Sequence, residues 1–144
     1  MHQLRRRALS ALATVALAAG GLTIATAAAA PASASTPSCN GHYLRAGNLG
    51  VPGYNSGSTS TYVCVLSQGR TGNPVKWLQQ SLRYCYGKNI ATDGIFGPAT
   101  RAALVAVQKK VGVAADGVYG PLTAKAIQHS GYANGSGQQF CMKF

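Results

Sequence analysis

Hydrophobic residues recur at helical spacing in the middle of the chain. Between residues 74 and 85 they fall on a single face at i, i+3, i+7 and i+10, at Val75, Leu78, Leu82 and Cys85. This spacing predicts an amphipathic helix. The same argument predicts helices over residues 98–111 and 121–130, each of which begins at a proline and is followed by a glycine.

The segments on either side of these helices lack such periodicity. Residues 35–69 are rich in Gly, Ser, Thr and Tyr, and within them the run YVCVL at 62–66 fits a short strand or an extended strap. We therefore predict an all-α fold. A small three-helix domain over residues 70–130 would carry a disulfide-braced, irregular N-terminal strap over 35–69 and a short C-terminal tail over 131–144.

An internal repeat lies within the helical part. Residues 93–100 (DGIFGPAT, the first repeat) are echoed 23 positions later by residues 116–123 (DGVYGPLT, the second repeat), which indicates one structural unit used twice. Asp-Gly is typical of a tight turn, because glycine can take a positive φ and aspartate can accept backbone N–H groups. Gly-Pro suits the start of a helix. The residues given these structural roles are Asp93, Gly94, Gly97, Pro98, Thr100, Asp116, Gly117, Gly120, Pro121 and Thr123.

The repeats and the helix before them resemble a known family. The pattern Val75-x-x-Leu78-Gln79-x-x-Leu82, the two Asp-Gly-x-aromatic-Gly-Pro-x-Thr motifs and Gln108 between them are similar to the peptidoglycan-binding domain family. The resemblance covers residues 69–128 and implies a three-helix peptidoglycan-binding-like domain attached non-covalently to peptidoglycan. Val107 stands where the family commonly has phenylalanine, which indicates a repacked core.

The first 34 residues have the features of a secretory signal peptide. Three consecutive arginines precede an apolar, Ala-rich stretch, and residues 32–34 (ASA) match the pattern of signal-peptidase cleavage. The alternative is a retained membrane anchor. Cleavage after residue 34 leaves 110 residues, one domain's worth, which we expect to be secreted or held at the cell wall and to be monomeric.

All four cysteines follow the predicted cleavage site. An even number in a short exported chain favours two disulfide bonds over a metal site or a catalytic thiol. Three pairings are open. We favour Cys39–Cys64, which would brace the strap, and Cys85–Cys141, which would tie the tail to the helices. We expect no metal and no cofactor.

Charge adds a second candidate partner. Cleavage removes three of the 13 basic residues, which leaves ten against two acidic residues and a formal charge of +8. Such a charge draws a protein to polyanions, which outside a bacterium include the anionic wall polymers. Nucleic acid fits the charge but not the compartment, and no contact with the membrane is expected after cleavage.

The scarcity of acidic residues argues against an enzyme. Glycan cleavage typically needs two carboxylates in contrasting environments, and the only two here, Asp93 and Asp116, hold equivalent positions in a repeat. We therefore predict a secreted, non-catalytic module that binds peptidoglycan. A small cell-wall hydrolase and a secreted inhibitor or structural wall protein remain the alternatives.

A ligand groove is expected between the first helix and the two Gly-Pro segments. Its candidate residues are Tyr119, Arg83 and Arg101, which offer aromatic surface and cations for a glycan or a peptide. Trp77 and Tyr84, on another side of the first helix, are a separate candidate: a platform for a sugar ring, with Arg83 beside it. The competing interpretation of Trp77 and Tyr84 is that the N-terminal strap covers them, with Tyr62 or Val63 above. Phe96 is assigned to the core, and Gln79 and Gln108 are expected to tie helices to loops.

Overall fold

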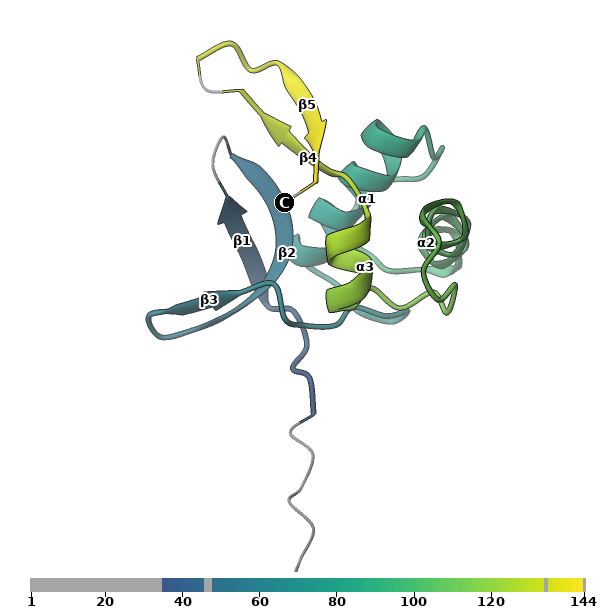
Figure 1. Cartoon of the computed structure of the whole chain (residues 1–144), viewed down its shortest axis with the longest axis horizontal. Coiled ribbons are helices and arrows are strands. Elements are labelled where there is room, and N and C mark those ends of the chain that lie inside the picture. Colours follow the sequence, from purple (N-terminus) through teal and green to yellow (C-terminus); the bar gives the residue numbers. More distant parts are fainter. Residues whose placement is uncertain (1–34, 46–47, 134, 144) are drawn as a thin grey trace, which may run out of the picture. The chain divides into compact units, whose positions relative to one another are not determined.

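The computed structural model describes residues 35–45, 48–133 and 135–143, so the expected signal peptide lies outside the described residues. Strands β1 (Gly41–Arg45), β2 (Leu49–Ser56) and β3 (Thr59–Thr61) come first. Helices α1 (Asn73–Tyr86), α2 (Pro98–Val111) and α3 (Pro121–Ala126) follow, and strands β4 (His129–Tyr132) and β5 (Gln139–Met142) complete the order (Figure 1). Within this described part, no helix is long and apolar enough to cross a bilayer.

The prediction of an all-α fold is wrong. The N-terminal strap and the C-terminal tail, both expected to be irregular, form an antiparallel sheet of five strands in the order β1-β2-β4-β5, with β3 paired to β2. β4 meets β2 where Gly131 faces Leu49. Helix α1 packs against both of these strands, which lie beside it in Figure 1. The sheet therefore pairs strands from the N-terminal and C-terminal parts of the described chain, and α1 packs against both.

The strands are hard to recognise in the sequence, because small residues occupy positions where other parts of the chain come close. Leu49 and Val51 of β2 are fully buried, but the positions around them include Gly50 and Gly53, so the strand shows little hydrophobic alternation. A Cβ on Gly50 would overlap the ring of Trp77, and one on Gly131 would overlap the ring of Phe140. These glycines are needed because other parts of the chain approach the sheet closely.

The helices agree with the sequence pattern except at the end of the third. α2 spans the predicted residues, and α1 exceeds its prediction by one residue at each end. The prediction of a helix over 121–130 is wrong beyond Ala126, because Ile127 is extended (φ −87°, ψ 160°). His129 and the residues after it pair with β5 instead.

A single hydrophobic cluster joins the helices to the N-terminal segment. Val75, Leu78 and Leu82 supply the stripe expected on α1, and each is fully buried. The other members of the cluster are Cys39, Cys64, Leu66, Phe96, Ala103, Leu104, Val107, Tyr119, Ala124 and Ile127. The core therefore draws on both repeats and on the segment that precedes α1.

Two disulfide bonds fasten the parts that lie outside the helices. Cys39–Cys64 closes the N-terminal segment on itself, and Cys85–Cys141 ties β5 to α1. No cysteine is left free. The two short strands at the C-terminal end are thus held to the helical part by a covalent bond as well as by β4–β2 pairing.

Replacing Cys85 and Cys141 together by alanine should lower the free energy of unfolding by about 4 kcal/mol, because this bond closes a long loop in the unfolded chain. Its cysteines are 56 residues apart, against 25 for the other pair. Urea denaturation of the parent and the double variant would measure the change. Hydrogen exchange should also accelerate in β4 and β5, and an unchanged denaturation midpoint would contradict the prediction.

Candidate functional site

One glutamine side chain fixes the first repeat to helix α1. The carbonyl oxygen of Gln79 accepts a hydrogen bond from the N–H of Gly94 at 2.8 Å. Its amide nitrogen lies 2.9 Å from Asp93 Oδ1, 3.0 Å from the carbonyl oxygen of Ile95 and 3.1 Å from Thr100 Oγ1. Gln79 is 1% exposed, so water does not compete for these groups.

The second repeat is fixed to helix α2 in the same way. Gln108 accepts from the N–H of Gly117 at 2.9 Å, and its amide nitrogen lies 2.9 Å from both Asp116 Oδ1 and the Val118 carbonyl oxygen. Thr123 Oγ1 is 3.1 Å away. We call these two sets of contacts the glutamine bridges. They join helices to loops, the role that the sequence suggested for both glutamines.

Each aspartate also stabilises its own turn. Asp93 accepts the N–H of Ile95 at 2.8 Å, and Asp116 accepts the N–H of Val118 at 2.9 Å. The backbone N–H of Ile95, followed by the Gln79 amide, lowers the pKa of Asp93, and the N–H of Val118 is the largest cause of the lowered pKa of Asp116. The two carboxylates therefore have closely similar surroundings and stay ionised.

The extended segment before α1 contacts both repeats. Leu66 and Tyr119 exchange backbone hydrogen bonds of 2.8 and 2.9 Å in the second repeat. In the first repeat, the N–H of Phe96 donates to Arg70, and the N–H of Gly72 donates to the carbonyl oxygen of Gly94. This segment therefore holds the two repeats next to each other.

Tyr119 belongs to the core. Its side chain is 0% exposed, and its ring meets that of His129 edge-on at 6.1 Å. Burial raises the pKa of Tyr119 and lowers the pKa of His129 to about 4. A side chain enclosed in this way cannot reach a surface ligand, so we do not include Tyr119 in the proposed binding surface. Phe96, at 1% exposed, is a core residue, as predicted.

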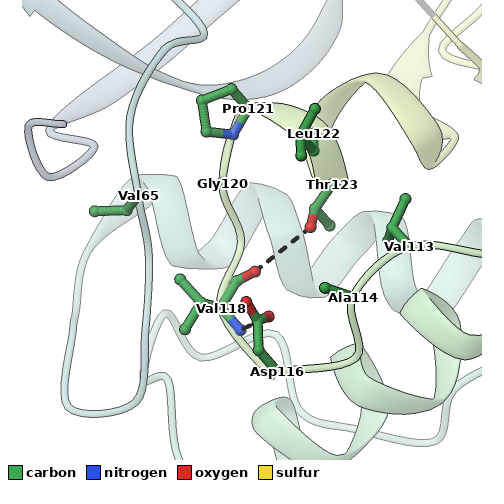
Figure 2. Close-up of a pocket in the computed structure, with 9 residues that line it drawn as sticks. All are labelled: Val65, Val113, Ala114, Asp116, Val118, Gly120, Pro121, Leu122 and Thr123. Atoms are coloured by element: carbon green, nitrogen blue, oxygen red, sulfur yellow. Dashed lines mark hydrogen bonds between the residues drawn. The ribbon is translucent and has the colours of Figure 1, made fainter.

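A mainly apolar pocket lies at the second repeat, with a volume of about 240 Å³. Figure 2 shows Val118 and Gly120 between Val65 on one side and Val113 with Ala114 on the other. The remaining lining residues are Asp116, Pro121, Leu122 and Thr123. Leu122 is 78% exposed, which leaves a large apolar side chain at the opening.

A second pocket, of about 300 Å³, lies where α1 meets β1. Four of its residues, Asn73, Lys76, Trp77 and Gln80, come from one face of α1, and His42 comes from β1. The rings of His42 and Trp77 are 6.0 Å apart and tilted by 49°. The N-terminal segment therefore covers part of Trp77, through Gly50 and His42.

The remaining candidate residues are dispersed. Arg83 donates to the Ile90 carbonyl oxygen at 3.1 Å, and Arg101 donates to the backbone carbonyl of Asp116 at 3.1 Å. Tyr84 is 51% exposed. None of these three lines either pocket described above, so the structure does not gather the candidate residues into one groove.

Several pocket residues were missed by the sequence argument. Lys76 and Gln80 lie next to Trp77 on α1 and were within the predicted helix, so their spacing was a usable signal. Asn73 was not, because it precedes the predicted start of that helix by one residue. His42 carried no such signal, because its place depends on the pairing of β1 with β2. Within the described residues, no cluster of three or more His, Cys, Asp or Glu side chains is placed to hold a metal ion.

Comparison with known families assigns the helical part. Residues 71–127 match the model of a family described as "Putative peptidoglycan binding domain". The match includes both repeats and both glutamine bridges. It excludes the strands, which all lie outside residues 71–127.

Three solved structures are similar over 41% of the chain. The first is a peptidoglycan-binding protein from Clostridioides difficile in complex with glutamine hydroxamate, at 42% identity and a TM-score of 0.40, with 37% of that chain covered. The second is the SleB N-terminal domain, at 37% identity and a TM-score of 0.40, with 81% of that chain covered. The third is a Burkholderia AP3 phage endolysin, at 41% identity and a TM-score of 0.39, with 22% of that chain covered. The chain thus spans 37% of the first of these and 22% of the endolysin. No curated protein matches the chain.

Replacing Gln79 or Gln108 by alanine should each lower the free energy of unfolding by about 2–4 kcal/mol, because a buried N–H and several acceptors lose their partner. Thermal and urea denaturation would measure it. Gln128 is partly buried and belongs to neither bridge, so Gln128→Ala serves as the control. It should lower the free energy of unfolding by less than either bridge variant. Parent-like stability of both bridge variants would show that the bridges do not hold the repeats.

The free energy of unfolding should fall as the pH drops from about 6.5 to about 4. The pKa of His129 is about 4 in the folded protein and 6.5 in the unfolded chain, so within this range only the unfolded chain binds the proton. The full effect is on the order of 3 kcal/mol. Urea denaturation across this range would measure the slope, and His129→Gln should flatten it. Below this range the lowered pKa values of Asp93 and Asp116 cause a further loss as each is protonated. A slope that His129→Gln leaves unchanged would refute the assignment.

Proposed function

We propose that this chain is an exported, non-catalytic module that binds the peptidoglycan of bacterial cell walls. The observation that carries the proposal is the family match over residues 71–127, a segment in which both repeats and both glutamine bridges are intact. The signal-peptide pattern of residues 1–34 and the two disulfide bonds support export, since such bonds persist in oxidising compartments.

Three kinds of side chain support a binding role over catalysis. Asp93 and Asp116, the only acidic residues in the chain, are both engaged in turns and have similar environments. A glycan hydrolase needs two carboxyl groups whose environments differ, one protonated and one ionised. All four cysteines are in disulfide bonds, so none offers a thiol nucleophile. His129 is buried against Ala124.

The apolar pocket at the second repeat is the proposed contact with the wall peptide. All of its lining residues except Val65 lie within the family segment. Small apolar pockets bind methyl-sized groups by removing them from water, and the alanines of the wall peptides present such groups. The ten basic residues of the exported part would add attraction to anionic wall polymers.

Purified sacculi stripped of anionic polymers should retain the protein without being degraded. The protein would be taken from the culture medium, and its intact mass should show a chain that starts at Ser35. Leu122→Ser should weaken retention by about tenfold, because it removes apolar surface at the pocket. Ile95→Ser is the matched control, since Ile95 is 55% exposed and lines neither pocket.

Salt distinguishes specific retention from adsorption. Part of the retention should survive about 1 M salt, where exposed charges are screened. Complete release by salt from stripped sacculi would reduce the binding to charge alone and overturn the proposal. A loss of turbidity of the suspension would instead favour the hydrolase.

A further inference from the structure

The two disulfide bonds differ in their exposure to solvent. Cys39 is 8% exposed and Cys64 is fully buried, and both belong to the hydrophobic cluster. Cys141 is exposed, and Cys85 is half-buried. We call Cys39–Cys64 the buried disulfide and Cys85–Cys141 the exposed disulfide. A thiol must contact a sulfur atom to exchange with it, so the exposed disulfide is the one open to attack in the folded protein.

Backbone hydrogen bonds close the chain over the buried disulfide. The N–H of Cys39 donates to the carbonyl oxygen of Val65 at 3.0 Å, and the N–H of Val65 donates to the carbonyl oxygen of Pro37 at 2.9 Å. Leu66, which follows, is 1% exposed and pairs with the second repeat. A thiol therefore reaches these sulfur atoms after the segment before α1 has left the core, which requires unfolding.

Strand β5 depends on the exposed disulfide for its attachment to α1. Trp77, Ser81 and Cys85 lie four residues apart on one side of α1 and contact β2, β4 and β5 in turn. β4 contributes three buried residues, whereas β5 contributes none and lies at the edge of the sheet (Figure 1). Little apolar burial would hold β5 in place once the bond is broken.

Basic residues lie close in sequence to both cysteines of the exposed disulfide. Arg83 and Lys88 flank Cys85, and Lys143 follows Cys141. The two acidic residues of the chain are both engaged in the turns of the repeats. The attacking form of a thiol is the negatively charged thiolate. A positively charged surface raises the local concentration of such a reagent and favours its attack.

We propose that the exposed disulfide is a site of thiol–disulfide exchange with a dithiol oxidoreductase, and that its reduction releases β5 from α1. A thiolate of the oxidoreductase attacks the Sγ atom of Cys141, the S–S bond breaks, and Cys85 leaves as a thiolate that takes up a proton. The second thiol of the oxidoreductase then attacks its own sulfur in the mixed disulfide and frees Cys141 as a thiol. The protein gains the electrons and protons of the dithiol, which leaves as a disulfide.

This exchange leaves the helical part in place. Neither glutamine bridge and none of the residues that line the apolar pocket belongs to β5. The buried disulfide still fastens the N-terminal segment to itself. Reduction is therefore a reversible change at the C-terminal end of the sheet, independent of the proposed contact with the wall.

Reduction of the exported protein by dithiothreitol tests the difference between the two bonds. Samples are quenched with acid and alkylated, and peptide masses then locate the free thiols. Cys85 and Cys141 should become labelled together, at least about tenfold faster than Cys39 and Cys64. Equal rates for the two pairs, or faster reduction of the buried disulfide, would overturn the proposal.

Urea below the unfolding transition distinguishes direct attack from attack on an unfolded chain. It should hardly change the rate at the exposed disulfide, because the native state itself is attacked. It should accelerate reduction of the buried disulfide, which waits for unfolding. An equally steep dependence on urea for both bonds would show that the exposed disulfide also needs unfolding, and the site would then be refuted.

A thioredoxin whose second active-site cysteine is replaced by serine tests the attacked sulfur, because it cannot complete the exchange. It should be trapped as a mixed disulfide on Cys141, and trapping on Cys85 or no trapping would contradict the mechanism. In the selectively reduced protein, hydrogen exchange should accelerate in β4 and β5 and stay unchanged in α2. Unchanged exchange in β5 would show that the bond does not hold this strand.

Discussion

The helical part of this protein depends on one buried glutamine amide in each repeat. The side-chain amide of Gln79 or Gln108 offers one carbonyl oxygen and two N–H donors, and each bridge places three acceptors and one backbone donor around it. One buried side chain thereby fixes a helix, an Asp-Gly turn and the start of the next helix relative to one another. Glycine is required at position 94 and at 117, because the donating N–H belongs to a residue with φ of 76° or 73°.

The sheet depends on the helical part in turn. The segment that contacts both repeats leads directly into α1, and the face of α1 that carries Trp77 and Ser81 is covered by strands. Ser81 accepts the N–H of Ser130 in β4 at 3.1 Å, and Trp77 packs on Gly50 in β2. Strands as short as β4 and β5 are marginal alone. Their contacts with α1 and the Cys85–Cys141 bond stabilise these strands.

Local chemistry predicted the helices, and long-range contacts determined the rest. The starts of α2 and α3 follow from Gly-Pro, and the end of α2 follows from Gly112, because caps act within a few residues. The sheet could not be predicted in this way, since β2 pairs with a strand about 80 residues further along the chain and carries glycine where Trp77 approaches. The early end of α3 has the same cause, because residues 129–132 pair with β5. Of the candidate site, the sequence supplied Trp77, but its neighbour His42 comes from that unpredicted sheet.

This division between a family segment and an added sheet bears on how the protein would hold the wall. The apolar pocket is built almost entirely from the family segment, whereas the aromatic pocket needs β1, which the sheet positions. With both carboxylates engaged in turns, the basic side chains meet little internal charge, and under the proposed function they would add attraction to anionic wall polymers. The added sheet supports the helices through α1, and it also places His42 beside Trp77.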